Sequence, residues 1–332
     1  MRQEHPFAQY VRILGKGRKG STSLSLEEAR TAMQMILSGE AQPFQIGAFL
    51  MLIRVREETA EETAGFVTAA RAILEKPVKS YSVDLDWASY AGKRRQLPWF
   101  LLSALLLAKN GVRIFLHYLV DRDDGRVYTD AALKALGIES SPSLTAAGEA
   151  LDRSGFASMP LDRLSPKLHE LIELRNVLGL RSPINTVARL LNPFDAPVAL
   201  HGIFHPGYRD IHKGAALLLG QPHMSVFKGE GGEAERNPDG ACLETIVRAG
   251  VVTEQEWPAL FDRRHLRDET MDVSRLGAFW RRECEDEYAE ASVIGTAAIA
   301  LRALGKATDM PSAEAMATDL WRNRPADWRP AP

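Results

Sequence analysis

The chain has 332 residues, of which 45% are hydrophobic and 25% charged, and its formal net charge is −2. These proportions are typical of a globular protein with a large core, and the length favours two domains. The near-neutral charge excludes a uniformly basic nucleic-acid binder, so any such binding needs a local cationic patch. Cys242 and Cys284 are too few and too far apart to indicate a disulfide framework or a zinc site.

No apolar run approaches the roughly 18 residues of a membrane helix, and the N-terminus lacks the apolar core of a signal peptide. The longest such run, at residues 100–108, suits a buried helix. We therefore expect a cytoplasmic protein without a membrane partner, and the two cysteines fit a reducing compartment.

Residues 1–80 predict helices only. Ser25 and Glu28 form a capping box ahead of one helix, and Pro43 begins another whose apolar residues recur at helical spacing. A glycine-containing connection before them carries three cations, which fit either a solvated loop or a binding arm. These cations are Lys16, Arg18 and Lys19.

Residues 83–117 predict a strand, a loop from about Trp87, a long apolar helix and a second strand. In such a unit the loop after the first strand meets a helix N-terminus, where anionic ligands bind. The loop holds Lys93, Arg94 and Arg95 in a row, with Gly92 as its only glycine. It is therefore electropositive through side chains and is not shaped to wrap a phosphate with backbone amides.

Strand and helix patterns alternate through the remaining chain, which predicts an α/β domain over residues 81–332 with a mostly parallel sheet. A helix at 165–180 is a candidate to pack against the helical domain, and the Pro-rich end from about residue 324 reads as a loose tail. The histidines after residue 200 lack metal-site spacing and are expected to be structural.

Several segments resemble anthranilate phosphoribosyltransferase and its relatives. The most specific is SGEAQPFQIGAFLMLIR, from Ser38 to Arg54. Further matches are LKALGI at 133–138, LGLRSPIN at 178–185, LLNP at 190–193 and IALRALGKA at 299–307. The resemblance covers almost the whole chain and implies a small N-terminal helical domain joined to a larger α/β domain. In that family the helical domain is commonly the dimer surface, so the resemblance also implies a homodimer.

The donor-binding motifs of the family are altered here. WASYAG at 87–92 stands where the enzymes have the glycine-rich GTGGD loop for the diphosphate of phosphoribosyl pyrophosphate. The KHGN motif falls at 116–119, where only His117 remains. Losing even one donor or metal ligand of this kind typically costs several kcal/mol at the transition state, so we expect little transferase activity. His117, Arg175 and Arg181 are vestigial catalytic candidates, the two arginines by their match to the family's RxxLGxR region.

The family's acidic pair for magnesium aligns with KGEGGEAE at 228–235. Ala234 replaces one partner, whereas Glu235 remains. Glu230 and Glu233 lie close enough in sequence to leave a metal site open as a weak possibility.

The chain is also similar to the YbiB-like paralogues of this family, through SYAGKRRQLP at 89–98 and FKGEGGE at 227–233. That resemblance implies a dimer that binds DNA or RNA without marked sequence preference and lacks the parent activity. Cations add affinity through counterion release, and aromatic side chains add stacking. The candidate nucleic-acid contacts are Lys93, Arg94, Arg95, Lys16, Arg18, Lys19, Trp87, Tyr90 and Lys228.

Our first hypothesis is thus a non-catalytic, cofactor-free protein that binds single- or double-stranded nucleic acid. The alternative is a phosphoribosyltransferase or related glycosyltransferase with an altered donor or acceptor, using Mg²⁺ and phosphoribosyl pyrophosphate. A third possibility is a binding module for a small anion.

Overall fold

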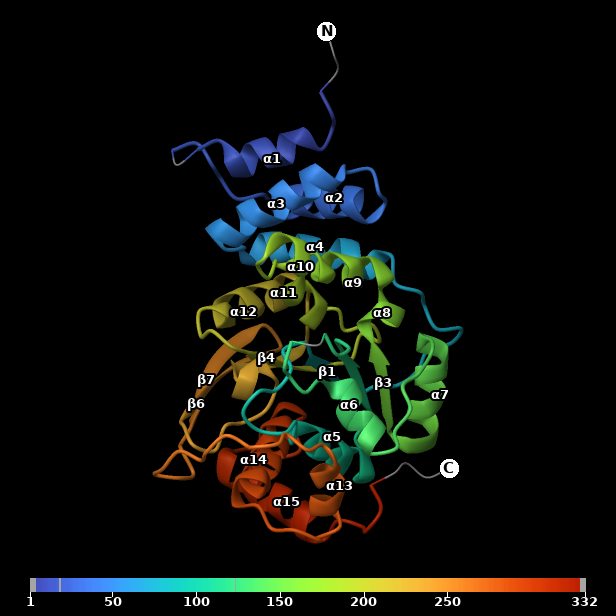
Figure 1. Cartoon of the computed structure of the whole chain (residues 1–332), viewed down its shortest axis with the longest axis vertical. Coiled ribbons are helices and arrows are strands. Elements are labelled where there is room, and N and C mark those ends of the chain that lie inside the picture. Colours follow the sequence, from blue (N-terminus) through green and yellow to red (C-terminus); the bar gives the residue numbers. More distant parts are fainter. Residues whose placement is uncertain (1–3, 18, 123, 329–332) are drawn as a thin grey trace.

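The computed structural model describes residues 4–17, 19–122 and 124–328. A helical bundle lies at one end of the long axis, a sheet crosses the middle, and further helices lie at the other end (Figure 1). The bundle contains α1 (Ala8–Gly15), α2 (Leu26–Leu37), α3 (Pro43–Arg56) and α4 (Ala60–Ala72). The expected capping box starts α2, because the Ser25 side chain accepts the Glu28 N–H and the Glu28 carboxylate accepts the Ser25 N–H.

The seven-stranded sheet has the order β3-β2-β1-β4-β5-β6-β7. Its parallel part consists of β1 (Leu85–Ser89), β2 (Ile114–Tyr118), β3 (Phe156–Pro160), β4 (Val198–Ile203) and β5 (His223–Lys228). An antiparallel hairpin, β6 (Cys242–Arg248) and β7 (Val251–Trp257), completes one edge. The predicted fold class, a helical domain plus an α/β domain with a mostly parallel sheet, is confirmed.

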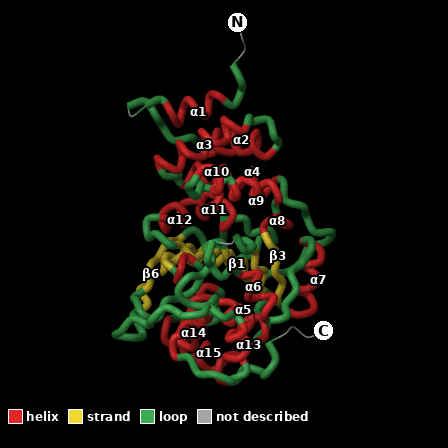
Figure 2. Tube along the Cα trace, viewed as in Figure 1, coloured by secondary structure: helices red, strands yellow, loops and turns green. Residues whose placement is uncertain are grey.

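Helices cover both faces of the sheet (Figure 2). On the far side from the bundle lie α5 (Phe100–Lys109), α13 (Ser274–Trp280), α14 (Glu287–Ala303) and α15 (Met310–Arg322). Between the sheet and the bundle lie α11 (Ile184–Arg189) and α12 (Tyr208–Leu218). The remaining elements are α6 (Thr129–Ala135), α7 (Leu144–Ser154), α8 (Leu161–Leu164), α9 (Pro166–Glu173), α10 (Arg175–Leu178) and the 3₁₀ turn η1 (Glu230–Gly232).

The segment expected as one helix at 165–180 folds as α9 and α10. Leu178 of α10 lies against Gly47 of α3, so this segment does contact the bundle. The domain boundary near residue 80 stays a prediction; the chain leaves α4 at residue 72 and enters the sheet at Leu85. No helix in the described part of the chain is long and apolar enough to cross a membrane.

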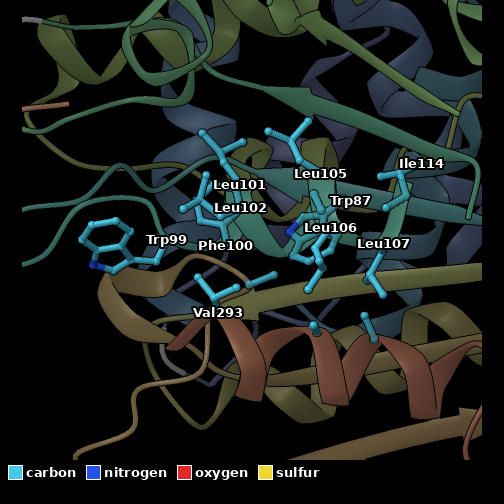
Figure 3. Close-up of a cluster of buried hydrophobic side chains, with 14 of the residues drawn as sticks. Trp87, Trp99, Phe100, Leu101, Leu102, Leu105, Leu106, Leu107, Ile114 and Val293 are labelled. Atoms are coloured by element: carbon cyan, nitrogen blue, oxygen red, sulfur yellow. The ribbon is translucent and has the colours of Figure 1, made fainter. Parts of the chain in front are cut away.

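The larger core lies between the sheet and the far helices (Figure 3). Every residue of α5 from Phe100 to Ala108 is buried, as its uninterrupted apolar sequence requires. The Trp87 ring stacks on Phe100 with centroids 6.2 Å apart, and Trp99 meets Phe279 edge to face at 5.3 Å. The loop expected from Trp87 therefore begins only after Ser89, because Trp87 to Ser89 pair with β2.

A close backbone approach joins β4 to the segment that follows η1. A Cβ at Gly202 would overlap the backbone of Glu233. We predict that Gly202→Ala lowers the free energy of unfolding by about 1–3 kcal/mol, because the backbones of β4 and of the segment after η1 must separate.

Chemical denaturation measures this loss, and Gly240→Ala is the matched control, since nothing lies within 4 Å of its Cβ position. Equal stability of the two variants would contradict the close packing of these segments.

Candidate functional site

The loop after β1 binds a carboxylate group of the protein itself. One carboxylate oxygen of Glu233 accepts the backbone N–H groups of Ala91 at 2.7 Å and Gly92 at 2.6 Å. Two convergent N–H groups are the arrangement that loops of this kind offer to a phosphate oxygen. Because Glu233 is buried, this anion position is filled from within.

Lys93 is the second part of this closed site. Its side chain is buried and its ammonium contacts the carboxylates of Glu230 and Glu235. Burial alone would lower the pKa of Lys93, but the two carboxylates outweigh burial and raise it. Lys93 is therefore an internal cation, and its expected role as an exposed nucleic-acid contact is corrected.

Glu235 also occupies the N-terminus of α5. Its second oxygen accepts the backbone N–H of Phe100 at 2.8 Å, in the position where a helix start favours negative charge. Burial raises the pKa of Glu235 to about 7, and Lys93 opposes that shift. We call Lys93, Glu230, Glu233 and Glu235 the carboxylate plug.

The three glutamates expected as weak metal candidates are thus committed to Lys93 and to backbone amides. In the described residues no group of three or more His, Cys, Asp or Glu side chains is placed to hold a metal ion.

His117 lies on β2 below the same loop and is fully buried. Its Nδ1 is 2.7 Å from the Tyr90 hydroxyl, and its Nε2 is 3.1 Å from a carboxylate oxygen of Asp86. Both ring nitrogens are used inside the protein, so His117 has a structural role here.

Two aromatic candidates are corrected for the same reason. Trp87 and Tyr90 are both 0% exposed and cannot stack on bases. Trp87 belongs to β1, and its side chain packs in the core. The Tyr90 hydroxyl forms a hydrogen bond with His117. A different aromatic side chain, Phe204, is 58% exposed between β4 and α12.

The remaining predicted cations fall into two places. Arg94, Arg95 and Lys228 are exposed near the ends of β1 and β5, and Arg95 and Lys228 both line a cavity of about 200 Å³. Lys16 and Lys19 are exposed in the turn after α1, at the far end of the bundle (Figure 1). Arg18 lies outside the described residues.

A second cavity, of about 280 Å³, lies between the bundle and the sheet. We call it the arginine pocket, because its lining includes Arg54, Arg126, Arg181 and Arg189. Arg54 comes from α3, Arg126 from the loop after β2, and Arg181 and Arg189 from either end of the α11 segment. Of these four arginines, the sequence indicated only Arg181 as a candidate site residue. The other three could not be found from the sequence, because only the fold brings these positions together.

Positive charge in the arginine pocket is only partly compensated. No carboxylate lines it, and across the described residues no ion pair forms with Arg54, Arg181 or Arg189. Burial, together with repulsion from neighbouring arginines, lowers the pKa of Arg181 to about 10. Arg126 is the exception, because Asp124 lies 3.5 Å away.

A hydrogen bond of Arg126 connects the arginine pocket to the carboxylate plug, and Arg175 lies outside the pocket. Arg126 donates to the backbone carbonyl of Ala91 at 2.8 Å and so holds the loop of the carboxylate plug. Arg175 does not line the cavity; it lies 3.5 Å from Asp124 and is half-buried beside it.

The inner wall of the arginine pocket includes a buried histidine that is backed by a second one. His212 lines the cavity, is 1% exposed, and has its Nδ1 3.2 Å from Nδ1 of His201. Burial lowers the pKa of His212 to about 3, so the ring is neutral at pH 7. The two histidines therefore add no charge to the pocket, whereas the buried carboxylate of Glu58 lies just behind the lining, where it accepts a hydrogen bond from Thr186 at 2.8 Å.

A helical bundle beside a mostly parallel sheet is the architecture of a class of glycosyltransferases, and residues 10–73 match the family model described as "Glycosyl transferase family, helical bundle domain". The chain is 30% identical over 237 residues to anthranilate phosphoribosyltransferase of Moorella thermoacetica, covering 69% of this chain and 68% of that relative. It therefore belongs to the anthranilate phosphoribosyltransferase-like family, which includes YbiB-like proteins.

Two further comparisons agree with this assignment. The chain is 28% identical over 206 residues to the uncharacterized protein YbiB of Escherichia coli, covering 61% of this chain and 64% of YbiB. The crystal structure of anthranilate phosphoribosyltransferase from Thermus thermophilus has the same fold, with a TM-score of 0.79, 22% identity and coverage of 96% and 95% of the two chains.

The carboxylate plug generates a testable prediction. Glu233→Ala leaves the N–H groups of Ala91 and Gly92 without an acceptor, which should cost about 1–3 kcal/mol of unfolding free energy. Sulfate or phosphate should restore part of the melting temperature of this variant by occupying the vacated position. Differential scanning fluorimetry across an anion titration measures both effects.

Glu233→Gln is the control, because its amide oxygen still accepts hydrogen bonds while the charge is lost. Equal anion stabilisation of Glu233→Ala and the parent protein would contradict the view that Glu233 occupies an anion position.

The buried His212 predicts a pH effect. Its folded-state pKa lies below the unfolded value of about 6.5, so between pH 6.5 and 3 only the unfolded chain binds the proton, and stability falls as pH falls. Relative to His212→Asn, the parent protein should lose about 1–3 kcal/mol between pH 7.5 and 4.5. Urea denaturation at several pH values measures this difference, and parallel stability curves would show that His212 titrates normally.

Proposed function

We propose that this protein binds nucleic acid through the sugar-phosphate backbone, without marked sequence preference, and does not transfer phosphoribosyl groups. The observation that supports the proposal is the arginine pocket. It offers positive charge beside the loop after β1, where the protein's own carboxylates occupy the expected phosphate position. We further propose that no metal or cofactor is needed. A cytoplasmic location stays a prediction.

The carboxylate plug supports the loss of transferase activity. A diphosphate at the loop would have to displace Glu233 from two N–H groups and Glu235 from the start of α5. Both displaced carboxylates, and Glu230 beside them, would then repel the incoming anion in a poorly solvated site. Lys93 would also lose the two carboxylates that compensate its buried positive charge.

The arrangement of exposed groups supports a strand path. Phe204 and Gly231 line both the arginine pocket and the cavity that holds Arg95 and Lys228, so the two cavities adjoin. Phosphates can contact cations on either side of Phe204, while a base stacks on its exposed ring, a contact worth about 1–3 kcal/mol in single-strand binders. The same cavity also contains Glu230 and Asp239, which limits the contribution of that half of the path.

A homodimer is part of the proposal. Phe44 on α3 and Val177 on α10 are 91% and 80% exposed, although both are apolar. The two helices touch each other through Leu178 and Gly47, and we propose that a second copy covers these exposed side chains. Two copies would double the number of phosphate contacts.

A phosphoribosyltransferase with an altered donor or acceptor is the second candidate. The names of relatives such as the Moorella enzyme favour it. Incubation with phosphoribosyl pyrophosphate, Mg²⁺ and anthranilate tests it by pyrophosphate release; turnover at an ordinary enzymatic rate would overturn our proposal.

The nucleic-acid proposal predicts a particular salt dependence. We expect a labelled single-stranded oligonucleotide to bind with an affinity that falls steeply with salt, by about 0.7 log units per phosphate contact for each log unit of salt. The double variant Arg54→Ala/Arg181→Ala should lower that slope by about 1.4, because two contacts are lost. Fluorescence anisotropy at several salt concentrations measures the slope.

Arg281→Ala is the control, since that arginine is exposed, pairs with Glu283 and lies on the far helices. A second variant, Lys16→Ala/Lys19→Ala, tests whether the distant end of the bundle takes part. An unchanged slope in the Arg54/Arg181 variant would exclude the arginine pocket as a phosphate site.

A further inference from the structure

We propose that the arginine pocket binds a phosphomonoester, and that its source is the terminal phosphate of a nucleic-acid strand. This inference rests on the proposed function and adds to it a preference for strand ends over internal phosphodiesters. The shared chemistry is a dianionic phosphate on a sugar, which a free nucleotide also carries.

The charge of the pocket suits a dianion. A phosphomonoester carries about −1.5 to −2 charges at pH 7 and three acceptor oxygens, whereas an internal diester carries one charge. Among the described residues no carboxylate lies within ion-pair distance of Arg54, Arg181 or Arg189, although Glu58 interacts electrostatically with Arg54 and Glu233 with Arg189. Positive charge in the pocket is therefore only partly compensated and is available to a ligand. Burial, and then repulsion from Arg126, Arg189 and Arg175, lowers the pKa of Arg181, and two negative charges would relieve that repulsion better than one.

The donors are of the type that phosphate recognition needs. Guanidinium groups present paired N–H donors in a rigid plane, which match the oxygens of a phosphate. Arg189 is held in place because its Nη1 donates to the carbonyl of Asn185 at 2.8 Å. Ser182 and Tyr208 add hydroxyl groups to the lining.

The depth of the pocket favours a strand end. Arg189 is only 8% exposed and His212 only 1%, so both lie at the inner wall, while Phe204 lies exposed at the rim. A continuous backbone would need an exit past that inner wall, where His201 is buried behind His212. At about 280 Å³ the cavity is at the lower end of small-ligand pockets and suits a phosphate with its sugar.

The residues at the rim of the arginine pocket then define the direction in which the bound nucleic-acid strand leaves it. With the terminal phosphate among the arginines, the first base would stack on Phe204 and the next phosphates would run past Arg95 and Lys228. A free nucleotide would fill the same pocket without using those two outer cations.

The test compares three labelled oligonucleotides of one sequence, with a 5′-phosphate, a 3′-phosphate or hydroxyl groups at both ends. We expect one phosphorylated form to bind at least about tenfold more tightly than the hydroxyl form at near-physiological salt. Arg181→Ala should remove this difference, and Arg281→Ala should retain it. Melting temperatures of both variants verify that they are folded.

Equal affinity for all three oligonucleotides would overturn the inference while leaving the proposed nucleic-acid binding intact. A separate thermal-shift titration with adenosine 5′-monophosphate distinguishes the source. Stabilisation by the nucleotide with no binding of any oligonucleotide would support a phosphomonoester site but overturn the proposed function. Absence of both responses would overturn the site as well.

Discussion

The buried contact between Lys93 and the carboxylates of Glu230 and Glu235 determines what this scaffold can bind. Removing one partner from such a group typically costs about 3–5 kcal/mol, because a charge is left buried without compensation. The same segment places Glu233 on the amides of Ala91 and Gly92, so these two donors of the loop are satisfied internally. The loop is thus a self-contained part of the core, and a phosphate bound at these two amides would have to replace interactions of the fold itself.

Positive charge is instead concentrated in the arginine pocket. Arg126 links the two regions, because it lines the arginine pocket and also donates to the carbonyl of Ala91 in the closed loop. The pocket combines arginines from the bundle, from the loop after β2 and from the α11 segment, so its geometry depends on how the bundle packs on the α/β domain. A chain with a net charge of −2 can therefore present a local site for phosphate without a basic surface overall.

Much of the fold could be predicted from the sequence, because capping boxes, apolar helical spacing and buried strands are local signals. The β6–β7 hairpin was missed: its turn is Ala249-Gly250, with φ values of +49° and +79°, and lacks the usual Asn-Gly or Asp-Gly signal. The site was harder to predict. Lys93 stands beside Arg94 and Arg95 and looks equivalent to them, but its burial depends on Glu235, which is 142 positions away. Arg54, Arg126 and Arg189 carry no shared motif and meet only through tertiary packing.

A crystal structure of the protein with a short 5′-phosphorylated single-stranded oligonucleotide tests most directly which region takes phosphate. We expect phosphate density among Arg54, Arg181 and Arg189, with Glu233 still bound to the amides of Ala91 and Gly92. Phosphate bound at those amides, with Glu233 displaced and Lys93 released from its carboxylates, would contradict this account and favour the phosphoribosyltransferase alternative.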